Sequence, residues 1–91
     1  MPIRINLNKE FLSLDQLKPG EIGMIQDYKG MGEISGRIKE LGLIRGSLVL
    51  VKKYAPFNDP LEIVVRGSHL SLRKKEASQI VVIKVLPKIE P

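Results

Sequence analysis

The chain has 91 residues and a mass of 10.2 kDa, and 43% of its residues are hydrophobic, so it can form one small domain but not two. It contains no cysteine and one histidine, which excludes disulfides, thiolate metal sites, thiol nucleophiles and multi-imidazole metal sites within one chain. No apolar run exceeds four residues, whereas a membrane-spanning helix needs roughly 20, and the N-terminus has no signal-peptide pattern. We therefore expect a cytoplasmic protein without a membrane span.

The positive charge is concentrated in one part of the chain. The formal net charge is +5, and residues 45–75 contain seven Lys or Arg against two acidic residues, which accounts for all of it. A basic region of this kind favours acidic protein surfaces, phosphates or anionic lipid headgroups, without choosing among them. The alternative is a solvated basic face with no partner.

Turn signals divide the chain into short strands. Lys18-Pro19-Gly20 is typical of a tight turn, because proline fixes φ and glycine adopts positive φ. Residues 55–60 contain two prolines and an Asn-Asp pair, which predict the connection of a long hairpin. Residues 73–79 predict a helical turn. Aliphatic and β-branched residues predict strands over residues 21–28, 48–54, 61–66, 70–72 and 80–86.

One short helix interrupts this pattern. Ile34, Ile38 and Leu41 recur at i, i+4 and i+7, the spacing that places three side chains on one helical face. Gly42 then ends the helix as the left-handed residue after the last turn. In that position Leu43 packs against Ile38, as in a Schellman cap.

These elements predict a mainly β fold, a small barrel of about five strands with one short helix. A closed sheet removes exposed strand edges in a chain that is too short for two layers. We assign the barrel to residues 13–86. Residues 1–12 are an N-terminal extension or an extra strand, and residues 87–91 are a C-terminal tail.

The sequence offers apolar and basic candidates for contact with a partner. Leu43 and Ile44 are adjacent apolar residues in a tight turn, so the one that faces solvent is a candidate anchor. Phe57 follows Pro56 at the expected hairpin tip, where an exposed aromatic ring is unfavourable unless it has a use. Basic side chains are candidates for pairing with acidic groups. The candidate partner-binding residues are Leu43, Ile44, Arg45, Pro56, Phe57, Arg66, Arg73, Lys74 and Lys75.

The sequence predicts no enzyme activity, no cofactor and no metal site. No nucleophile motif joins the serines, the carboxylates and His69. His69 alone does not make a metal site, because zinc or ferrous iron would need carboxylates or a second subunit's imidazole to complete the coordination shell. The oligomeric state, and with it a metal site at a subunit interface through His69, stays open.

Four motifs in a fixed order carry a resemblance to a known family. They are LDQLKPGE at 14–21, KELGLIRG at 39–46, APFNDPLEI at 55–63, and VRG followed by LSLRK within 65–74. The chain resembles the FeoA family (ferrous iron transport protein A) from about residue 14 to residue 85. The resemblance implies an SH3-like barrel and a small cytoplasmic protein associated with FeoB, the GTP-hydrolysing ferrous iron transporter of the bacterial inner membrane.

The function that the resemblance implies is that of a non-enzymatic accessory protein of ferrous iron uptake. Such a protein binds the cytosolic region of the FeoB transporter, modulates its GTPase or its transport, and is recruited to the inner membrane through that partner. An alternative is a basic barrel that binds nucleic acid, with Lys52, Lys53, Arg66 and residues 73–75 as phosphate contacts. A further alternative is a metal-dependent regulatory accessory domain, because related domains end some metal-dependent repressors.

Overall fold

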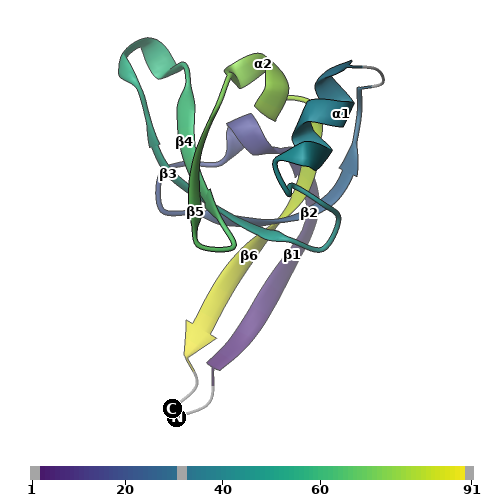
Figure 1. Ribbon diagram of the computed structural model, residues 1–91. Helices are drawn as coiled ribbons and strands as arrows, with labels where there is room; N and C mark the ends of the chain where they lie inside the picture. The colour runs from purple at the N-terminus through teal and green to yellow at the C-terminus, as the bar shows by residue number, and fades with distance from the viewer. Residues whose placement is uncertain (1–2, 31–32, 90–91) are drawn as a thin grey trace.

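The computed structural model of the chain describes residues 3–30 and 33–89. It is a curled antiparallel sheet of six strands, accompanied by two short α-helices and two 3₁₀ turns (Figure 1). In chain order the elements are β1 (Ile3–Ser13), η1 (Leu14–Gln16), β2 (Ile22–Tyr28), α1 (Glu33–Glu40), β3 (Leu48–Tyr54), η2 (Pro56–Asn58), β4 (Leu61–Val65), β5 (Ser68–Leu72), α2 (Lys74–Ala77) and β6 (Ile80–Ile89).

The strands pair in the order β1-β6-β2-β3-β4-β5, and every pair is antiparallel. Strands β2 to β5 and the first part of β6 curl around a common interior. The ends of β1 and β6 continue beyond it as a two-stranded ribbon that leads to both termini (Figure 1). This ribbon explains the elongated outline of 46 × 27 × 23 Å.

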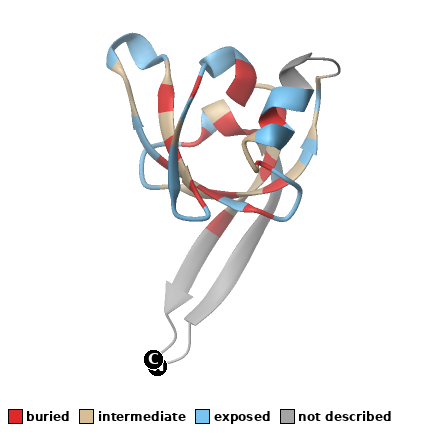
Figure 2. Cartoon of the chain, viewed as in Figure 1, coloured by how far each residue is buried: buried red, intermediate tan, exposed pale blue. Residues whose placement is uncertain are grey.

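Strand alternation places one set of side chains inside the curl. In β3, Val49 and Val51 are fully buried, whereas Leu48 and Lys52 face solvent. The same alternation holds in β4, and Figure 2 shows the buried residues lining the interior of the curl. The core consists of Leu14, Leu17, Ile25, Ile38, Leu43, Val49, Val51, Leu61, Ile63, Val65, Leu72, Ala77, Ile80 and Val82.

Helix α1 ends in the cap that the sequence predicts. Gly42 has φ +84°, its N–H donates to the Lys39 carbonyl at 3.0 Å, and the Leu43 N–H donates to the Ile38 carbonyl at 3.2 Å. These are the two hydrogen bonds of a Schellman motif, and Ile38 and Leu43 are both fully buried. The predicted helix end is therefore confirmed. The side chain of Ile34, the first residue of the expected helical face, lies outside the described side chains.

Helix α2 confirms the predicted helical turn before the last strand, and a buried carboxylate fixes it to α1. One oxygen of Glu76 accepts the Arg73 N–H at 3.0 Å, and the other accepts the Arg37 Nε–H of α1 at 2.5 Å. Glu76 is 9% exposed, and each of its carboxylate oxygens accepts a hydrogen bond, one of them from the cationic Arg37. A buried carboxylate is tolerated when it is paired in this way.

The mainly β class is confirmed, and three details differ from the expectation. Over the described residues there are six strands and two α-helices, because the N-terminal residues form β1 against β6, which is the extra-strand alternative, and residues 74–77 form α2. Strand β6 continues to Ile89, so residues 87–89 are paired strand where the sequence predicts a tail; the local signal of Pro87 is overridden by pairing with Ile5. Finally, β1 and β5 are the edges of the pairing order over the described residues, so hydrogen bonds do not close the sheet.

Candidate functional site

The predicted contact residues do not form one site. The turn after α1 precedes β3, and the β3–β4 connection follows it, so a seven-residue strand spanning roughly 20 Å separates the two groups. Leu43 belongs to neither group because it is fully buried, whereas Ile44 is 41% exposed. The expectation that Leu43 contacts a partner is therefore wrong, and Ile44 is the exposed member of the pair.

We call the first group the turn surface, and its central feature is a fixed arginine. Arg45 Nη2 donates to Asp27 Oδ1 at 2.7 Å, and its guanidinium lies 5.6 Å from the centroid of the Tyr28 ring. The Lys39 Nζ lies 5.8 Å from the same centroid. Cations at these distances from an aromatic face are attracted to its quadrupole. The turn surface consists of Tyr28, Lys39, Ile44, Arg45 and Arg66.

Hydrogen bonds also fix the Tyr28 ring and the Asp27 carboxylate on the turn surface. The Tyr28 hydroxyl donates to the Leu43 carbonyl, which fixes the ring to the turn. Burial raises the pKa of the Tyr28 phenol, so it stays a neutral donor at ordinary pH. Two hydrogen bonds lower the pKa of Asp27. The larger effect comes from the Arg45 side chain and the smaller one from the Tyr28 N–H. Arg45 is therefore held beside a carboxylate that remains ionised.

Arg66 lies on the turn surface because of the β4–β5 hairpin. Arg66 and Gly67 form its two-residue turn with φ +51° and +78°, both in the left-handed region that such tight hairpins require. The Arg66 Nη2 lies 3.4 Å from Ser47 Oγ, and the Ser47 N–H donates to the Ile44 carbonyl at 3.0 Å. Arg66 is thus joined to the Ile44 turn and is distant from the basic residues of α2.

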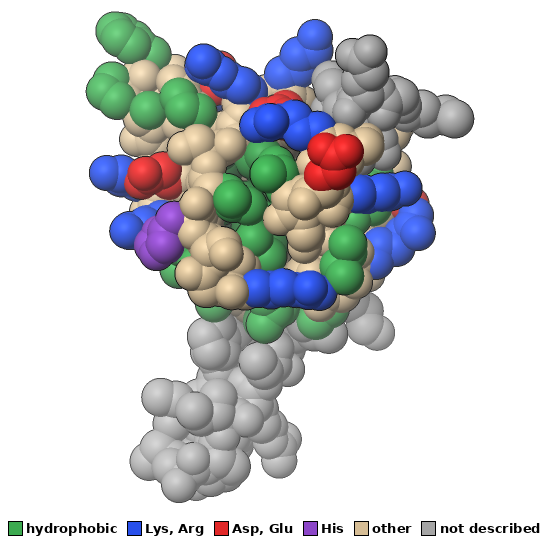
Figure 3. All heavy atoms as spheres, in the orientation of Figure 1, with side chains coloured by type: hydrophobic (Ala, Val, Ile, Leu, Met, Phe, Trp, Pro, Cys, Tyr) green, Lys and Arg blue, Asp and Glu red, His purple; other side chains and the backbone are tan. Residues whose placement is uncertain are grey.

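We call the second group the tip surface; it consists of Pro56, Phe57, Arg73, Lys74 and Lys75. The Phe57 side chain is 99% exposed. Its φ is +70°, a left-handed conformation that a bulky residue rarely adopts. In Figure 3 hydrophobic side chains gather at the upper left of the molecule, with Lys and Arg side chains beside them.

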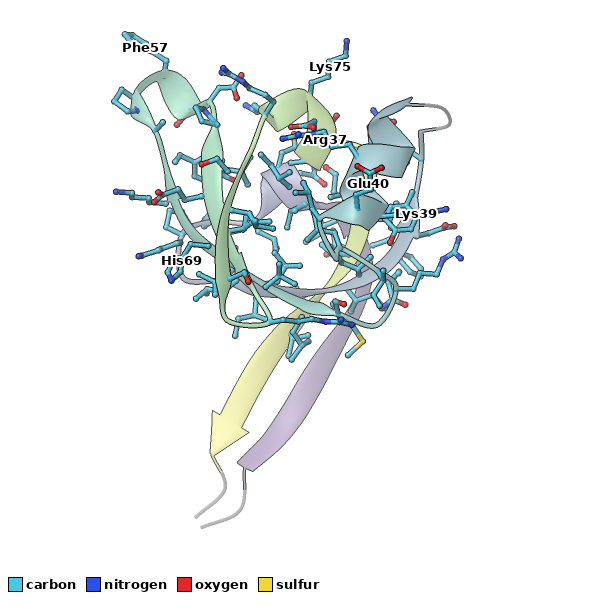
Figure 4. The ribbon with its side chains drawn as sticks, viewed as in Figure 1. Arg37, Lys39, Glu40, Phe57, His69 and Lys75 are labelled. Atoms are coloured by element: carbon cyan, nitrogen blue, oxygen red, sulfur yellow. The ribbon has the colours of Figure 1, made fainter. Side chains whose placement is uncertain are left out.

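Helix α2 is fixed directly to this connection. Asp59 Oδ1 accepts the backbone N–H of Lys74 at 3.0 Å, which holds the start of α2 against the end of η2. Phe57 and Lys75 both point away from the barrel at the same end of the molecule (Figure 4). Among the described side chains, Arg73, Lys74 and Lys75 are exposed and make no ion pair.

A shallow pocket of about 310 Å³ lies beside the tip surface. The Lys53 Nζ and Glu62 Oε2 form an ion pair 3.5 Å apart in its wall, and no histidine lines it. The pocket therefore offers an apolar floor and a neutralised charge pair, which suit contact rather than bond-making chemistry. Its lining residues are Lys53, Tyr54, Ala55, Pro56, Pro60, Glu62 and Ser71.

The described residues present no membrane-spanning helix and no clustered metal ligands. None of their helices has the length and hydropathy to cross a bilayer. Across residues 3–30 and 33–89, no three His, Cys, Asp or Glu side chains gather in a way that would hold a metal ion. His69 is exposed on β5 and pairs across the strands with Val64.

Sequence reasoning missed one apolar surface on the outside of the sheet. Phe11 pairs with Ile83, Ile83 with Met24, and Met24 with Leu48, so these residues form one row across β1, β6, β2 and β3. Phe11 is 65% exposed and Leu48 is 46% exposed. Two uninterrupted apolar runs, residues 48–51 and residues 80–83, carried the signal for this surface. A run without polar residues places apolar side chains on both faces of a strand.

Comparison with known proteins gives consistent matches. The FeoA domain family matches residues 12–84. A curated relative, the Fe(2+) transport protein A/Fe(2+) transporter FeoB fusion protein of Porphyromonas gingivalis, is 31% identical over 69 residues. That match covers 76% of this chain and 8% of the fusion protein, so the chain spans less than a tenth of that relative.

Two solved structures share the fold. The solution structure of the FeoA protein from Chlorobium tepidum has 33% identity and a TM-score of 0.72, and the match covers 79% of this chain and 70% of that one. The crystal structure of Stenotrophomonas maltophilia FeoA, complexed with zinc, has 25% identity and a TM-score of 0.69, with 78% and 88% covered. That protein is described as a prokaryotic SH3 domain protein, so the predicted SH3-like barrel is confirmed.

Proposed function

Because the chain belongs to the FeoA family, we propose that it is a non-enzymatic accessory protein of ferrous iron transport. In this proposal it binds the cytosolic region of a FeoB-like, GTP-hydrolysing transporter and modulates it. The observation that carries the proposal is the relative in which an Fe(2+) transport protein A and an FeoB transporter are one polypeptide. Fusion raises the effective concentration of two modules that work together, and a separate chain must replace the tether with surface contacts.

The turn surface is the part of the molecule that best suits a protein partner. Arg45 contacts both Asp27 and the Tyr28 ring, and these two contacts favour one orientation of its side chain at the surface. Tyr and Arg dominate the energetics of protein interfaces, and the half-exposed Ile44, next to Arg45 in the chain, adds an apolar anchor. The nearby carboxylate gives this surface both signs of charge, which favours a specific protein partner over a uniformly charged one.

Modulation follows if the partner exists in more than one nucleotide state. A GTPase domain changes its surface between its GDP and GTP forms. A protein that binds one form more tightly shifts the equilibrium toward that form by its difference in affinity. Binding through a fixed surface such as Arg45 and Tyr28 would therefore alter GTP hydrolysis or transport without any catalytic group on this chain.

The test is a calorimetric titration of the full chain with the cytosolic GTPase domain of an FeoB-like transporter from the same genome. The nucleotide-free, GDP and GTP-analogue states are each measured. We expect binding in at least one state, with Arg45→Gln and Ile44→Ser each weakening it at least about tenfold.

Lys52→Gln is the matched control, because it removes one exposed positive charge from β3 outside the turn surface and should leave the affinity unchanged. An absence of binding at tens of micromolar in all three states contradicts the proposed function. Equal losses for Arg45→Gln and Lys52→Gln would show that charge alone, rather than the turn surface, mediates the interaction.

A further inference from the structure

We infer that the tip surface binds an anionic membrane surface directly. In this arrangement Phe57 enters the interfacial layer of the bilayer, while Arg73, Lys74 and Lys75 lie against anionic headgroups. This inference is independent of the proposed function, because it assigns a lipid contact to a different end of the molecule.

The exposure and backbone of Phe57 point to a role outside the fold. The ring is 99% exposed, so it contributes almost nothing to the core. Its φ of +70° is a conformation that a bulky residue adopts at a cost, whereas Asn58, at φ +64°, is of a residue type that tolerates it. The Asn58 N–H donates to the Ala55 carbonyl at 2.8 Å and closes the turn that fixes this conformation. A residue that is unfavourable in both backbone and hydration indicates a function at the tip.

The side chains next to Phe57 carry an excess of positive charge, since Arg73, Lys74 and Lys75 stand against the one exposed carboxylate of Asp59. Asp59 uses its Oδ1 for the Lys74 backbone N–H, and Glu76 is buried with both oxygens occupied by Arg73 N–H and Arg37 Nε. Neither carboxylate therefore pairs with the side-chain charges of α2 among the described contacts. The Lys75 side chain extends from the same end of the molecule as Phe57 (Figure 4), so this end presents positive charge as well as the exposed ring.

The shape of the tip favours a bilayer over a protein. The tip projects from the barrel as a hairpin end (Figure 1), and a projecting aromatic ring needs a matching cavity on a protein partner but none on a deformable bilayer. Basic side chains around an apolar residue match an anionic bilayer, which attracts Lys and Arg at its surface and accepts an aromatic ring at headgroup depth. The turn surface, by contrast, holds its carboxylate in a direct ion pair with Arg45.

The arrangement allows both contacts at once. The tip and turn surfaces lie at opposite ends of β3, roughly 20 Å apart. A chain bound to a membrane protein through one end can therefore touch the bilayer with the other. Each contact alone is weak, and the two together raise the effective concentration of this protein at the membrane.

The test uses the absence of tryptophan from the chain. Phe57→Trp introduces a single tryptophan at the tip, which is excited selectively over the two tyrosines, and Phe11→Trp places a single tryptophan at another exposed phenylalanine, on β1. Each variant is titrated with vesicles of phosphatidylcholine alone and with vesicles containing about one-third phosphatidylglycerol. We expect the emission of Phe57→Trp to shift to the blue only with the anionic vesicles, and that of Phe11→Trp to stay unchanged.

Co-sedimentation with the same vesicles measures the contribution of each group. Lys74→Glu combined with Lys75→Glu should reduce partitioning by about 20-fold or more, and added salt should reduce it in the wild type. Phe57→Gly should reduce partitioning while preserving the fold, because glycine suits the left-handed position. Lys52→Glu is the charge control and should have a smaller effect.

Three results would overturn the inference. The first is no binding to anionic vesicles, and the second is equal binding to neutral and anionic vesicles. The third is a blue shift of Phe57→Trp with soluble polyglutamate as large as that with vesicles, which would assign the tip to an acidic protein surface. No transporter is present in these measurements, so their failure leaves the proposed function unaffected.

Discussion

The turn after α1 and the β3–β4 connection each contain two residues in the left-handed backbone conformation, but the residue types differ. In the turn, the left-handed positions are Gly42 and Gly46, and the apolar residue that follows Gly42 is buried. In the connection, the left-handed positions are Phe57 and Asn58, and the phenylalanine is fully exposed. The first sequence is the one that folding favours. The second is unfavourable for folding, and that difference assigns Gly42, Gly46 and the buried Leu43 to stability and the exposed Phe57 to contact.

The largest expected effect comes from substituting the two adjacent apolar residues in the turn. Leu43→Ala removes a fully buried side chain from the core and should lower the free energy of unfolding by about 3 kcal/mol. Ile44→Ala, at a half-exposed position, should change it by less than about 0.5 kcal/mol. Urea denaturation of both variants measures the difference. Similar losses for the two would show that Ile44 is part of the core, and the turn surface would lose its anchor.

Gly42 tests the backbone side of the comparison. Gly42→Ala places a Cβ at φ +84°, where no atom lies within 4 Å, so the cost is conformational and should be about 1.5 kcal/mol. Gly36→Ala in α1 is the matched control, because its Cβ also meets nothing within 4 Å and alanine favours a helix, so stability should rise by about 0.5 kcal/mol. Thermal unfolding should show shifts of opposite sign. A destabilised Gly36→Ala variant would contradict the argument.

A tyrosine supports each region, and alkaline pH tests both. The Tyr28 hydroxyl donates to the Leu43 carbonyl, and the Tyr54 hydroxyl, just before the tip, donates its one proton to the Leu17 carbonyl and shares it with the Asp15 carbonyl at 3.0 Å. Tyr28→Phe and Tyr54→Phe should each cost about 1 kcal/mol at neutral pH.

Burial raises the pKa of both phenols above the ordinary value near 10. The unfolded state therefore loses these protons first, so their stabilising effect is complete below pH about 10 and is lost as the pH rises through the folded pKa. Unfolding free energies measured up to that range should converge between the wild type and each phenylalanine variant. A gap that widens with pH would contradict the assignment.

At the tip, the comparison predicts a small gain in stability. Phe57→Gly relieves a left-handed phenylalanine whose ring contributes nothing to the core, but glycine gains more freedom in the unfolded chain. The net change should be an increase in stability of about 0.5 kcal/mol, measured by urea denaturation. A clear destabilisation would mean that Phe57 contributes to the fold, and the contrast between turn and tip would fail.

The outcome of the sequence analysis follows the range of the interactions involved. Strand β3 has the predicted bounds of residues 48–54, and the cap around Gly42 has the predicted hydrogen bonds, because both depend on neighbouring residues. The prediction that the strand ends at Leu86 and is followed by a tail was wrong for residues 87–89. Pairing with β1, more than 70 residues away in the chain, extends β6 to Ile89. The sequence also did not reveal that Arg45 stacks on Tyr28, since that contact joins two elements separated by α1.

By itself, the amino-acid sequence determined the local elements, the family resemblance and the basic character of residues 45–75, because periodicity, turn residues and charge are properties of short segments. Only the tertiary structure decided which of Leu43 and Ile44 is buried, and it divided the basic residues between two distant surfaces. The physical reason is that burial and proximity depend on strand register and on the direction in which the sheet curls. Both are fixed by contacts among residues far apart in the chain.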